Sequence, residues 1–312
     1  MPPLRLVVAV NPTSSAGRRR GVGDSVVASL RAAGHTVVPL QEESHADLVD
    51  AVTAELGRGA DVLVVVGGDG MVNLGVGLVA GTEVALGVVP TGTGNDTARA
   101  LGLPHDDADA ATRLLVSLLE KPPAVVDAGR VTRGTEATWF GCVVSAGFDA
   151  VVNERANRLR WPRGHRRYDL ALALELLALR PLSYRLEIDG AASEVRGTLV
   201  SVLNGQSFGG GMRVAPGAVV DDGLLDVLVV DRLTRLQFVR LFAKIASGTH
   251  LADPRVHLHR ARRVVIESDD VVAYADGERV GTLPVTVEVV PGALRVHAPV
   301  GPRSSGTPAP PA

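Results

Sequence analysis

Apolar residues recur in short runs along the first 120 positions, and amphipathic stretches separate these runs. Runs rich in β-branched residues predict strands at 4–10, 35–40, 61–66 and 83–89. Helical spacing predicts helices up to about residue 33, over 46–58, from about residue 71 and after residue 96. Strands that alternate with helices in this way predict a parallel, doubly wound α/β sheet. We therefore assign residues 1–123 to a first domain of this kind.

The pattern changes near residue 124. Short apolar segments joined by Gly, Asp and Pro turns predict strands at 125–131, 138–146, 183–188, 195–203, 224–230, 263–268, 271–275 and 284–290. Only two stretches, 168–179 and 233–246, stand out as helices. Residues 124–300 are therefore expected to form a mainly antiparallel, sandwich-like second domain, with the active site in the cleft between the domains. The Pro- and Ser-rich segment 301–312 has the composition of a disordered tail.

Composition narrows the class of protein. The 312 residues include 32 basic and 34 acidic ones, so the charge gives no general attraction to nucleic acid. The one cysteine, Cys142, excludes an internal disulfide and favours a reducing compartment. No signal peptide is evident, and charged residues and a proline interrupt the longest apolar helical stretch, 170–182. We expect a cytoplasmic protein. A strand edge could pair two copies as a homodimer, but no pattern decides the oligomeric state.

Three loops of similar chemistry follow the predicted parallel strands. Small polar residues occupy 11–17, glycines and Asp69 occupy 67–73, and hydroxyls, glycines and Asn95-Asp96 occupy 91–96. Because parallel strands end at one edge of the sheet, these loops should converge there. Glycines also let backbone N–H groups approach an anion without obstruction from a side chain. The arrangement indicates a phosphate site, most simply for a nucleotide.

Three other motifs do not fit. A Rossmann fingerprint counted from Gly68 needs a glycine where Asn73 stands, and no Walker Lys-Ser/Thr pair follows any glycine loop. Residues 205–209 match Gly-x-Ser-x-Gly. The glycines and Pro216 that follow leave no helix for a nucleophile elbow, so this match is attributed to chance.

The ordered set Gly67-Gly68-Asp69-Gly70, then 90–96, then Asp276-Gly277-Glu278 resembles the diacylglycerol kinase catalytic family. That family includes bacterial soluble lipid kinases, sphingosine kinases and ceramide kinases. The similarity spans roughly residues 4–290 and includes further matches at 11–12, 146–150, 204–205, 209–212, 215–216 and 222–226. Gly-Gly-Asp-Gly alone also occurs in NAD kinases and phosphofructokinases. Two positions depart from the pattern, since Met71 replaces the usual threonine and Leu40 or Gln41 stands where relatives often place a threonine that contacts the nucleotide.

The resemblance implies a kinase that uses ATP and Mg²⁺ to phosphorylate a lipid hydroxyl, with diacylglycerol as the first expected acceptor. It implies Glu278 as general base, with Asp69 and Asp127 holding Mg²⁺ through water; relatives differ on whether this glutamate or the Gly-Gly-Asp-Gly aspartate takes the proton. It also implies a second, structural Mg²⁺ bound by the Asp222 carboxylate and the carbonyls of Val219 and Leu224. The implied nucleotide contacts are Asn11, Gly67, Gly68, Asp69, Gly70, Met71, Val72, Asn73 and Thr93.

Each of these residues also has a structural interpretation. Without the resemblance, Asp-Gly-Glu is a solvated β-turn, Asp96 is a helix N-cap, and Asp127 and Asp222 are turn residues. The segment 154–167 holds six arginines beside Trp161, which predicts either a solvated loop or contact of Arg155–Arg167 with an anionic membrane. Two alternative functions stay open, an NAD kinase-like enzyme and a nucleotide-binding protein without turnover.

Overall fold

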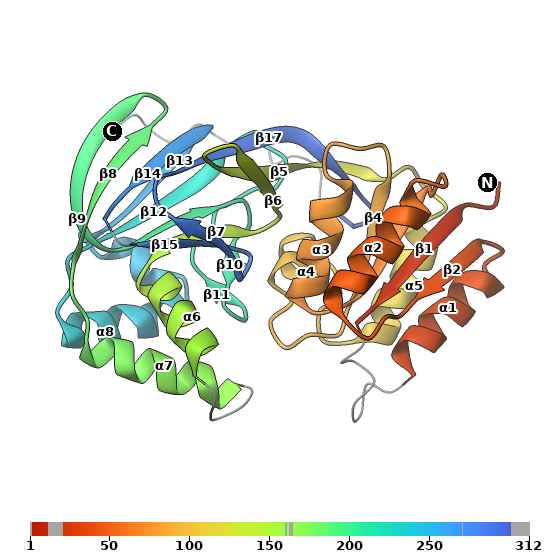
Figure 1. Ribbon diagram of the computed structural model, residues 1–312, viewed down its shortest axis with the longest axis horizontal. Coiled ribbons are helices and arrows are strands. Elements are labelled where there is room, and N and C mark those ends of the chain that lie inside the picture. The colour runs from red at the N-terminus through yellow and green to blue at the C-terminus, as the bar shows by residue number, and fades with distance from the viewer. Residues whose placement is uncertain (1, 12–20, 160, 162–164, 270, 301–312) are drawn as a thin grey trace.

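The computed structural model describes residues 2–11, 21–159, 161, 165–269 and 271–300, which form two lobes (Figure 1). The polar loop at 12–17 and the tail at 301–312 lie outside the described residues. One sheet runs through both lobes in the strand order β16-β15-β7-β9-β8-β14-β17-β4-β3-β1-β2. No helix among the described residues has the length and apolar character needed to cross a bilayer.

The first lobe is a parallel sheet covered by helices on both faces. Its strands are β1 (Arg5–Val10), β2 (Thr36–Leu40), β3 (Val62–Gly67) and β4 (Ala85–Pro90). Its helices are α1 (Val22–Ala32), α2 (His45–Leu56), α3 (Asp69–Val79), α4 (Asp96–Ala100) and α5 (Ala108–Leu118). The strands pair in parallel in the order β2-β1-β3-β4. The predicted doubly wound α/β sheet is confirmed.

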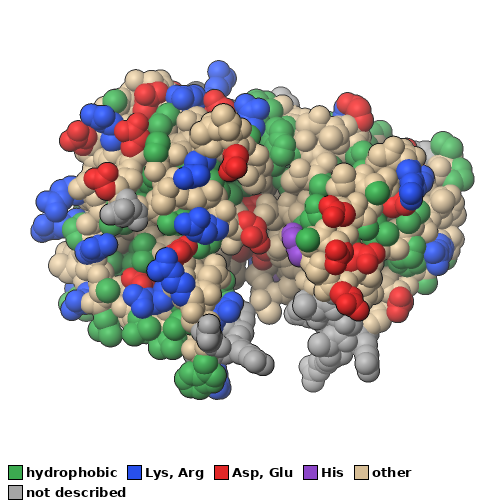
Figure 2. Space-filling view, viewed as in Figure 1, with side chains coloured by type: hydrophobic (Ala, Val, Ile, Leu, Met, Phe, Trp, Pro, Cys, Tyr) green, Lys and Arg blue, Asp and Glu red, His purple; other side chains and the backbone are tan. Residues whose placement is uncertain are grey.

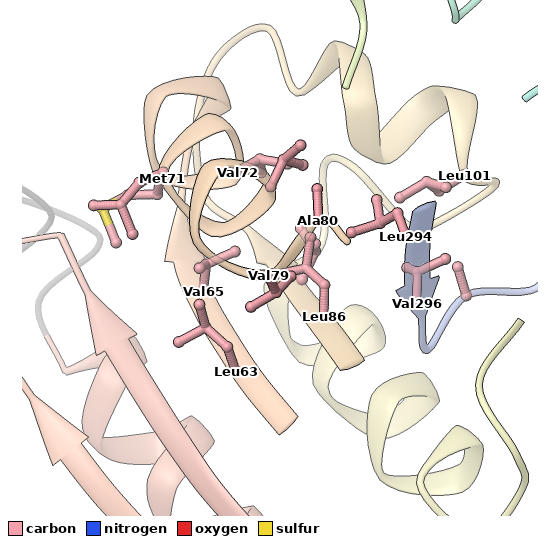
Figure 3. Close-up of a cluster of buried hydrophobic side chains, with 14 of the residues drawn as sticks. Leu63, Val65, Met71, Val72, Val79, Ala80, Leu86, Leu101, Leu294 and Val296 are labelled. Atoms are coloured by element: carbon pink, nitrogen blue, oxygen red, sulfur yellow. The ribbon is translucent and has the colours of Figure 1, made fainter. Parts of the chain in front are cut away.

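Strand β3 shows why the sheet is buried on both sides. Successive side chains of a strand point to opposite faces. Leu63 and Val65 pack in the core that includes Val79 of α3 (Figure 3), whereas Val62 and Val64 pack with residues of α1 and α5. An unbroken apolar run is therefore what this position requires.

The second lobe is antiparallel, as predicted, with helices packed on it (Figure 1). Its strands are β5 (Ala124–Arg133), β6 (Glu136–Phe140), β7 (Val143–Gly147), β8 (Leu182–Ile188), β9 (Ala191–Leu203), β10 (Ser207–Phe208), β11 (Met212–Arg213), β12 (Leu225–Asp231), β13 (Val256–Ala261), β14 (Arg263–Glu267), β15 (Val272–Ala275), β16 (Glu278–Thr282) and β17 (Val285–Val296). Its helices are α6 (Phe148–Arg158), α7 (His165–Leu177) and α8 (Arg235–Ile245), with a 3₁₀ turn at Thr249–Ala252.

Two predictions for this lobe were wrong. The strand expected at 138–146 is two strands, β6 and β7, separated at Gly141 and Cys142. The expectation of two helices omitted α6, which covers 148–158. Its buried positions, including Phe148, Val152 and Ala156, are separated by polar residues, so the apolar pattern is weak. The arginine-rich segment is therefore helical at both ends, where a solvated loop was one expectation.

The last strand links the lobes. β17 pairs with β5 and β14 of the second lobe, and Val296 at its end pairs in parallel with Leu86 of β4. Leu294 and Val296 also pack in the core of the first lobe (Figure 3). β5, the first strand of the second lobe, begins at Ala124. The division predicted after residue 123 does not include the end of β17, where the chain comes back to the first lobe.

Candidate active site

The glycine turn after β3 opens helix α3. Gly68 is the N-cap residue of this helix and Asp69 is its first residue. The first N–H groups of a helix have no partner within it, so they can bind an anion. A Cβ atom at Gly67 would lie 2.3 Å from Cγ of Met71, whereas a Cβ atom at Gly70 would have no neighbour within 4 Å. Packing thus requires Gly67, and Gly70 leaves open space in front of the helix.

The second glycine loop packs directly on the first. A Cβ atom at Gly92 would lie 2.6 Å from Cα of Gly68, which leaves no room for a side chain. The backbone amide of Thr91 donates to the carbonyl of Gly67 at 2.8 Å. The two loops therefore converge at one edge of the sheet, as their positions after neighbouring parallel strands predict.

Asp69 joins these loops through its carboxylate. Oδ2 accepts the backbone N–H of Asn95 at 2.8 Å, and Oδ1 accepts that of Asp96 at 2.7 Å. Burial raises the pKa of Asp69, and the nearby charge of Asp96 raises it further, while the backbone amides oppose the shift. A cation beside Asp69 would offset both the burial and the repulsion.

Asp96 connects the two lobes. The N-cap of α4 is Asn95, in a left-handed conformation, so the expectation that Asp96 caps this helix was wrong. The Asp96 carboxylate instead accepts the amides of Gly210 at 2.8 Å and Gly211 at 2.7 Å, between β10 and β11. Both glycines have φ near +90°, a backbone conformation that favours glycine.

Glu278 lies at the end of a tight turn between β15 and β16. Asp276 (φ +46°) and Gly277 (φ +88°) form this turn in left-handed conformations. The Asp276 carboxylate accepts the amides of Gly141 at 2.7 Å and Val143 at 2.8 Å, and burial raises its pKa to about 6. Asp276 was predicted only as part of the motif. It anchors the turn and so fixes the position of Glu278.

A cleft of about 370 Å³ brings these parts together between the lobes. Figure 2 shows the hollow, with acidic side chains and a histidine at its walls. Its lining residues are Asn11, Glu43, His45, Leu48, Gly68, Gly70, Met71 and Glu278. Five of these, Asn11, Gly68, Gly70, Met71 and Glu278, were predicted from the sequence. None of the described lining residues is Lys or Arg, and the backbone N–H groups at the start of α3 face this space.

Comparison with known proteins decides the family. The model of the diacylglycerol kinase catalytic domain matches residues 5–131, and that of the YegS C-terminal NAD kinase beta sandwich-like domain matches residues 142–298. A Mycobacterium tuberculosis (strain CDC 1551 / Oshkosh) protein named diacylglycerol kinase is 38% identical over 298 residues, or 95% of each chain. The chain belongs to the diacylglycerol kinase family. A Stenotrophomonas maltophilia (strain K279a) protein named "Probable lipid kinase YegS-like" is 30% identical over 80% of this chain and 82% of its own.

Solved structures confirm the two-domain fold of this family member. A diacylglycerol kinase from Bacillus anthracis str. Sterne superposes with a TM-score of 0.71 at 21% identity, covering 96% of this chain and 98% of its own. An NAD kinase from Archaeoglobus fulgidus, solved in complex with ATP, superposes with a TM-score of 0.53 at 14% identity, covering 93% and 92%. At these identities the likeness concerns the fold alone.

Three cleft residues were not predicted from the sequence. Glu43 lies in the connection between β2 and α2, and His45 and Leu48 lie in the first turns of α2. The only available signal was their position after the end of a parallel strand, where ligands bind in open α/β sheets. The connection lacks glycines, and it therefore does not resemble the other two loops.

Five predicted nucleotide contacts do not line the cleft, namely Gly67, Asp69, Val72, Asn73 and Thr93. Val72 is buried in the first-lobe core, and its amide donates to the Gly68 carbonyl within the helix. Asn73 is half-buried, and its Oδ1 has no hydrogen-bond partner among the described residues. Thr93 is exposed in the second glycine loop. The described arrangement leaves Val72 neither a side chain nor an amide for a ligand.

Asp127 holds backbone rather than facing the cleft. Its side chain is 4% exposed, and its carboxylate accepts the amides of Gly223 at 2.6 Å and Gly292 at 2.9 Å. Its own amide donates to the Val220 carbonyl at 2.8 Å. The expectation that Asp127 holds Mg²⁺ beside Asp69 finds no support in this geometry. Its contacts make it a positioning residue for the loop at 219–224.

Asp222, the carboxylate of the predicted structural metal site, contacts an arginine side chain in this structure. One oxygen of Asp222 forms an ion pair with Arg260, and the other accepts the amide of Leu224 at 3.0 Å. The Asp222 charge is thus already neutralised by a guanidinium. The described residues also contain no group of three or more His, Cys, Asp or Glu side chains that could hold a metal. The Mg²⁺ site expected at Val219, Asp222 and Leu224 therefore stays a prediction, and in this structure Arg260 pairs with its carboxylate.

Proposed function

We propose that this protein is an ATP-dependent lipid kinase that transfers the γ-phosphoryl group to a lipid hydroxyl, with diacylglycerol as the first acceptor to test. One observation carries the proposal. Glu278 of the second lobe and the glycine turn at the start of α3 line the same cleft. A phosphate-binding element and a proton acceptor thus face one space from opposite domains, which is the minimum that phosphoryl transfer requires.

The first lobe supplies the groups for binding ATP phosphates. The amide groups at the start of α3 and the open space at Gly70 suit close approach of an anion. Asn11 and Met71 line the same space. A methionine here offers no hydroxyl, so we assign phosphate binding at this turn chiefly to backbone amides.

The carboxylate of Asp69 fits Mg²⁺ in its chemistry. It is a hard oxygen donor whose charge is opposed by burial and by Asp96. Mg²⁺ bound with ATP would neutralise phosphate charge, and Asp69 is the residue that would hold it through water. Asp69 also fixes the start of α4 through two amides. Its substitution would therefore disturb both the ion and the glycine loops.

Glu278 is the proposed general base. The acceptor hydroxyl oxygen forms a bond to the γ-phosphorus while the bond between that phosphorus and the leaving ADP oxygen breaks. The hydroxyl proton passes to the Glu278 carboxylate and then to water. A loose transition state demands little deprotonation of the alcohol, so a carboxylate suffices. Asp276 acts as a positioning residue because it holds the turn that presents Glu278.

The choice of diacylglycerol as acceptor rests on the names of similar proteins and not on the residues that line the cleft. Proteins similar to this chain are named diacylglycerol kinase or lipid kinase. An apolar acceptor site discriminates weakly between lipid alcohols, so other acceptors need direct comparison. The NAD kinase fold likeness makes NAD the necessary negative control.

The proposal is tested by transfer of label from γ-labelled ATP in the presence of Mg²⁺. Mixed micelles of diacylglycerol, monoacylglycerol, sphingosine and ceramide are offered in parallel, with NAD in a separate reaction. Labelled phosphatidic acid is the expected product. Labelled NADP would establish the alternative enzyme, and ATP binding without any labelled product would leave a nucleotide-binding protein without turnover.

A further inference from the structure

Helix α8 carries two apolar stripes, one packed against the second lobe and one largely exposed. Phe238, Leu241 and Ile245 face inward and pack against the second lobe. The ring of Phe238 lies 4.4 Å from that of Phe148 on α6, measured between centroids. These contacts dock the helix. A second apolar stripe lies beside the first, and Phe242 of this stripe stacks on Phe238 with 6.0 Å between the ring centroids.

The second stripe consists of Leu236, Val239 and Phe242, which are 60%, 50% and 37% exposed. Their spacing of three residues places them along one side of the helix. Leu177 at the end of α7 is 65% exposed, and its carbonyl accepts a hydrogen bond from Arg235 on α8. We call Leu177, Leu236, Val239 and Phe242 the outer face. Soluble proteins rarely expose a contiguous patch of large apolar side chains without a partner.

The charge around the outer face has one sign. Residues 232–252 include no Asp or Glu, and Arg235, Arg240 and Lys244 are exposed on α8 itself. Figure 2 shows apolar and basic side chains gathered at the lower left, where Figure 1 places α7 and α8. A helix that combines an apolar stripe with flanking cations matches the interface of an anionic bilayer.

Two arginines of the segment 155–167 are paired within the protein. Arg155 forms an ion pair with Glu175, and Arg158 forms one with Glu154. These two arginines are therefore neutralised within the protein. Among the described residues, Arg240 and Lys244 of α8 form no ion pair. The acidic group near Lys244 is Asp253, which itself pairs with Arg255.

We propose that the outer face of α8 docks the protein on an anionic phospholipid surface. The proposal rests on the proposed function in one respect, since the acceptor of that reaction stays in a bilayer. A second copy of the chain is the competing occupant. Symmetric pairing of two such faces would bring like charges together, which opposes self-association. The charge pattern thus favours an anionic lipid surface.

Vesicle co-sedimentation without nucleotide or acceptor tests the proposal. Wild-type protein should bind vesicles of phosphatidylglycerol and phosphatidylcholine, and bind phosphatidylcholine alone weakly. Leu236→Ser with Val239→Ser should lower the partition constant about tenfold or more. Arg240→Gln with Lys244→Gln should lower it about fivefold for each charge removed, and added salt should mimic that change. Val125→Ser, a 48% exposed position on β5, is the matched control and should bind like wild type.

Three results would overturn the proposal. These are absence of wild-type binding to the anionic vesicles, equal binding by the Leu236/Val239 variant, and a wild-type dimer in light scattering that this variant converts to monomer. Thermal melting and circular dichroism check that each variant is folded. Phosphoryl transfer to a short-chain acceptor in solution is measured separately. Vesicle binding without transfer would leave the docking surface standing and refute the kinase.

Discussion

The Asp69 carboxylate accepts the backbone amide of Asp96 at 2.7 Å, and the Asp96 carboxylate accepts the amides of Gly210 and Gly211. Hydrogen bonds thus run from the start of α3, through α4, into the second lobe. Both lobes are fixed at the cleft by the same two aspartates. Neither motif that contains them predicts this connection by itself.

Substitution of Asp96 should loosen the connection between the lobes. In Asp96→Asn the amide side chain can accept with only one atom, so the amide of Gly210 or Gly211 loses its charged acceptor. We expect a loss of about 1–3 kcal/mol in the free energy of unfolding, measured by denaturant titration. Asp106→Asn, at an exposed position between α4 and α5, is the control and should change little. Equal stabilities of the two variants would contradict the assigned role of Asp96.

Two glycine-to-alanine changes should separate stability from nucleotide binding. Gly70→Ala places a methyl in open space within a helix, so stability should stay constant or rise by up to about 1 kcal/mol, while ATP binding falls. Gly92→Ala drives a methyl against Cα of Gly68 and should cost about 1–3 kcal/mol. Thermal melts and ATP titration by calorimetry measure both. Unchanged ATP affinity in Gly70→Ala would place the phosphates elsewhere.

Buried His250 should make stability depend on pH. Burial lowers its pKa, and Nε2 lies 2.9 Å from the Val214 carbonyl. The folded state resists protonation of His250 more than the unfolded state does. The contribution of neutral His250 to the free energy of unfolding is therefore complete above the unfolded pKa near 6.5, and it is lost as pH falls through the lower folded pKa. His250→Gln should therefore lose less stability between pH 7 and pH 5 than wild type. Parallel profiles in denaturant titrations would contradict this.

The ion pair of Asp222 with Arg260 predicts that the fold needs no divalent cation at this loop. Treatment with EDTA should leave the melting temperature of wild type unchanged. Because Arg260 is 44% exposed, Arg260→Gln should cost less than about 1 kcal/mol. If EDTA instead lowers the melting temperature and Mg²⁺ restores it, a cation rather than Arg260 holds Asp222, as the family resemblance implied.

The sequence predicted those helices, strands and loops that depend mainly on residues close together in the chain. The apolar run of β3 ends in glycines that the close packing of Gly68 against Gly92 requires, so strand and loop could both be expected. Helix α6 could not be expected, because its apolar positions are few and its burial depends on α7. The same limit applies to function. Glu278 belongs to a recognisable motif, whereas Glu43 and His45 do not.

Carboxylates were the hardest residues to assign from the sequence. Asp69, Asp96, Asp127 and Asp276 all accept backbone amides from segments distant in the chain. A sequence shows that an aspartate is present near a turn, but the amides that it binds are fixed only by tertiary structure. Asp96 was misassigned for this reason, and the Mg²⁺ role of Asp127 stays a prediction.

The most direct test compares phosphoryl transfer and ATP binding in wild type, Glu278→Gln and Glu43→Gln. Both glutamates line the cleft, so both variants remove one negative charge from it. If Glu278 is the general base, Glu278→Gln should bind ATP normally and transfer label to lipid roughly 100- to 10,000-fold more slowly, with Glu43→Gln close to wild type. Equal transfer rates for Glu278→Gln and wild type would contradict the proposed role of Glu278 and the assignment of this cleft as the catalytic site.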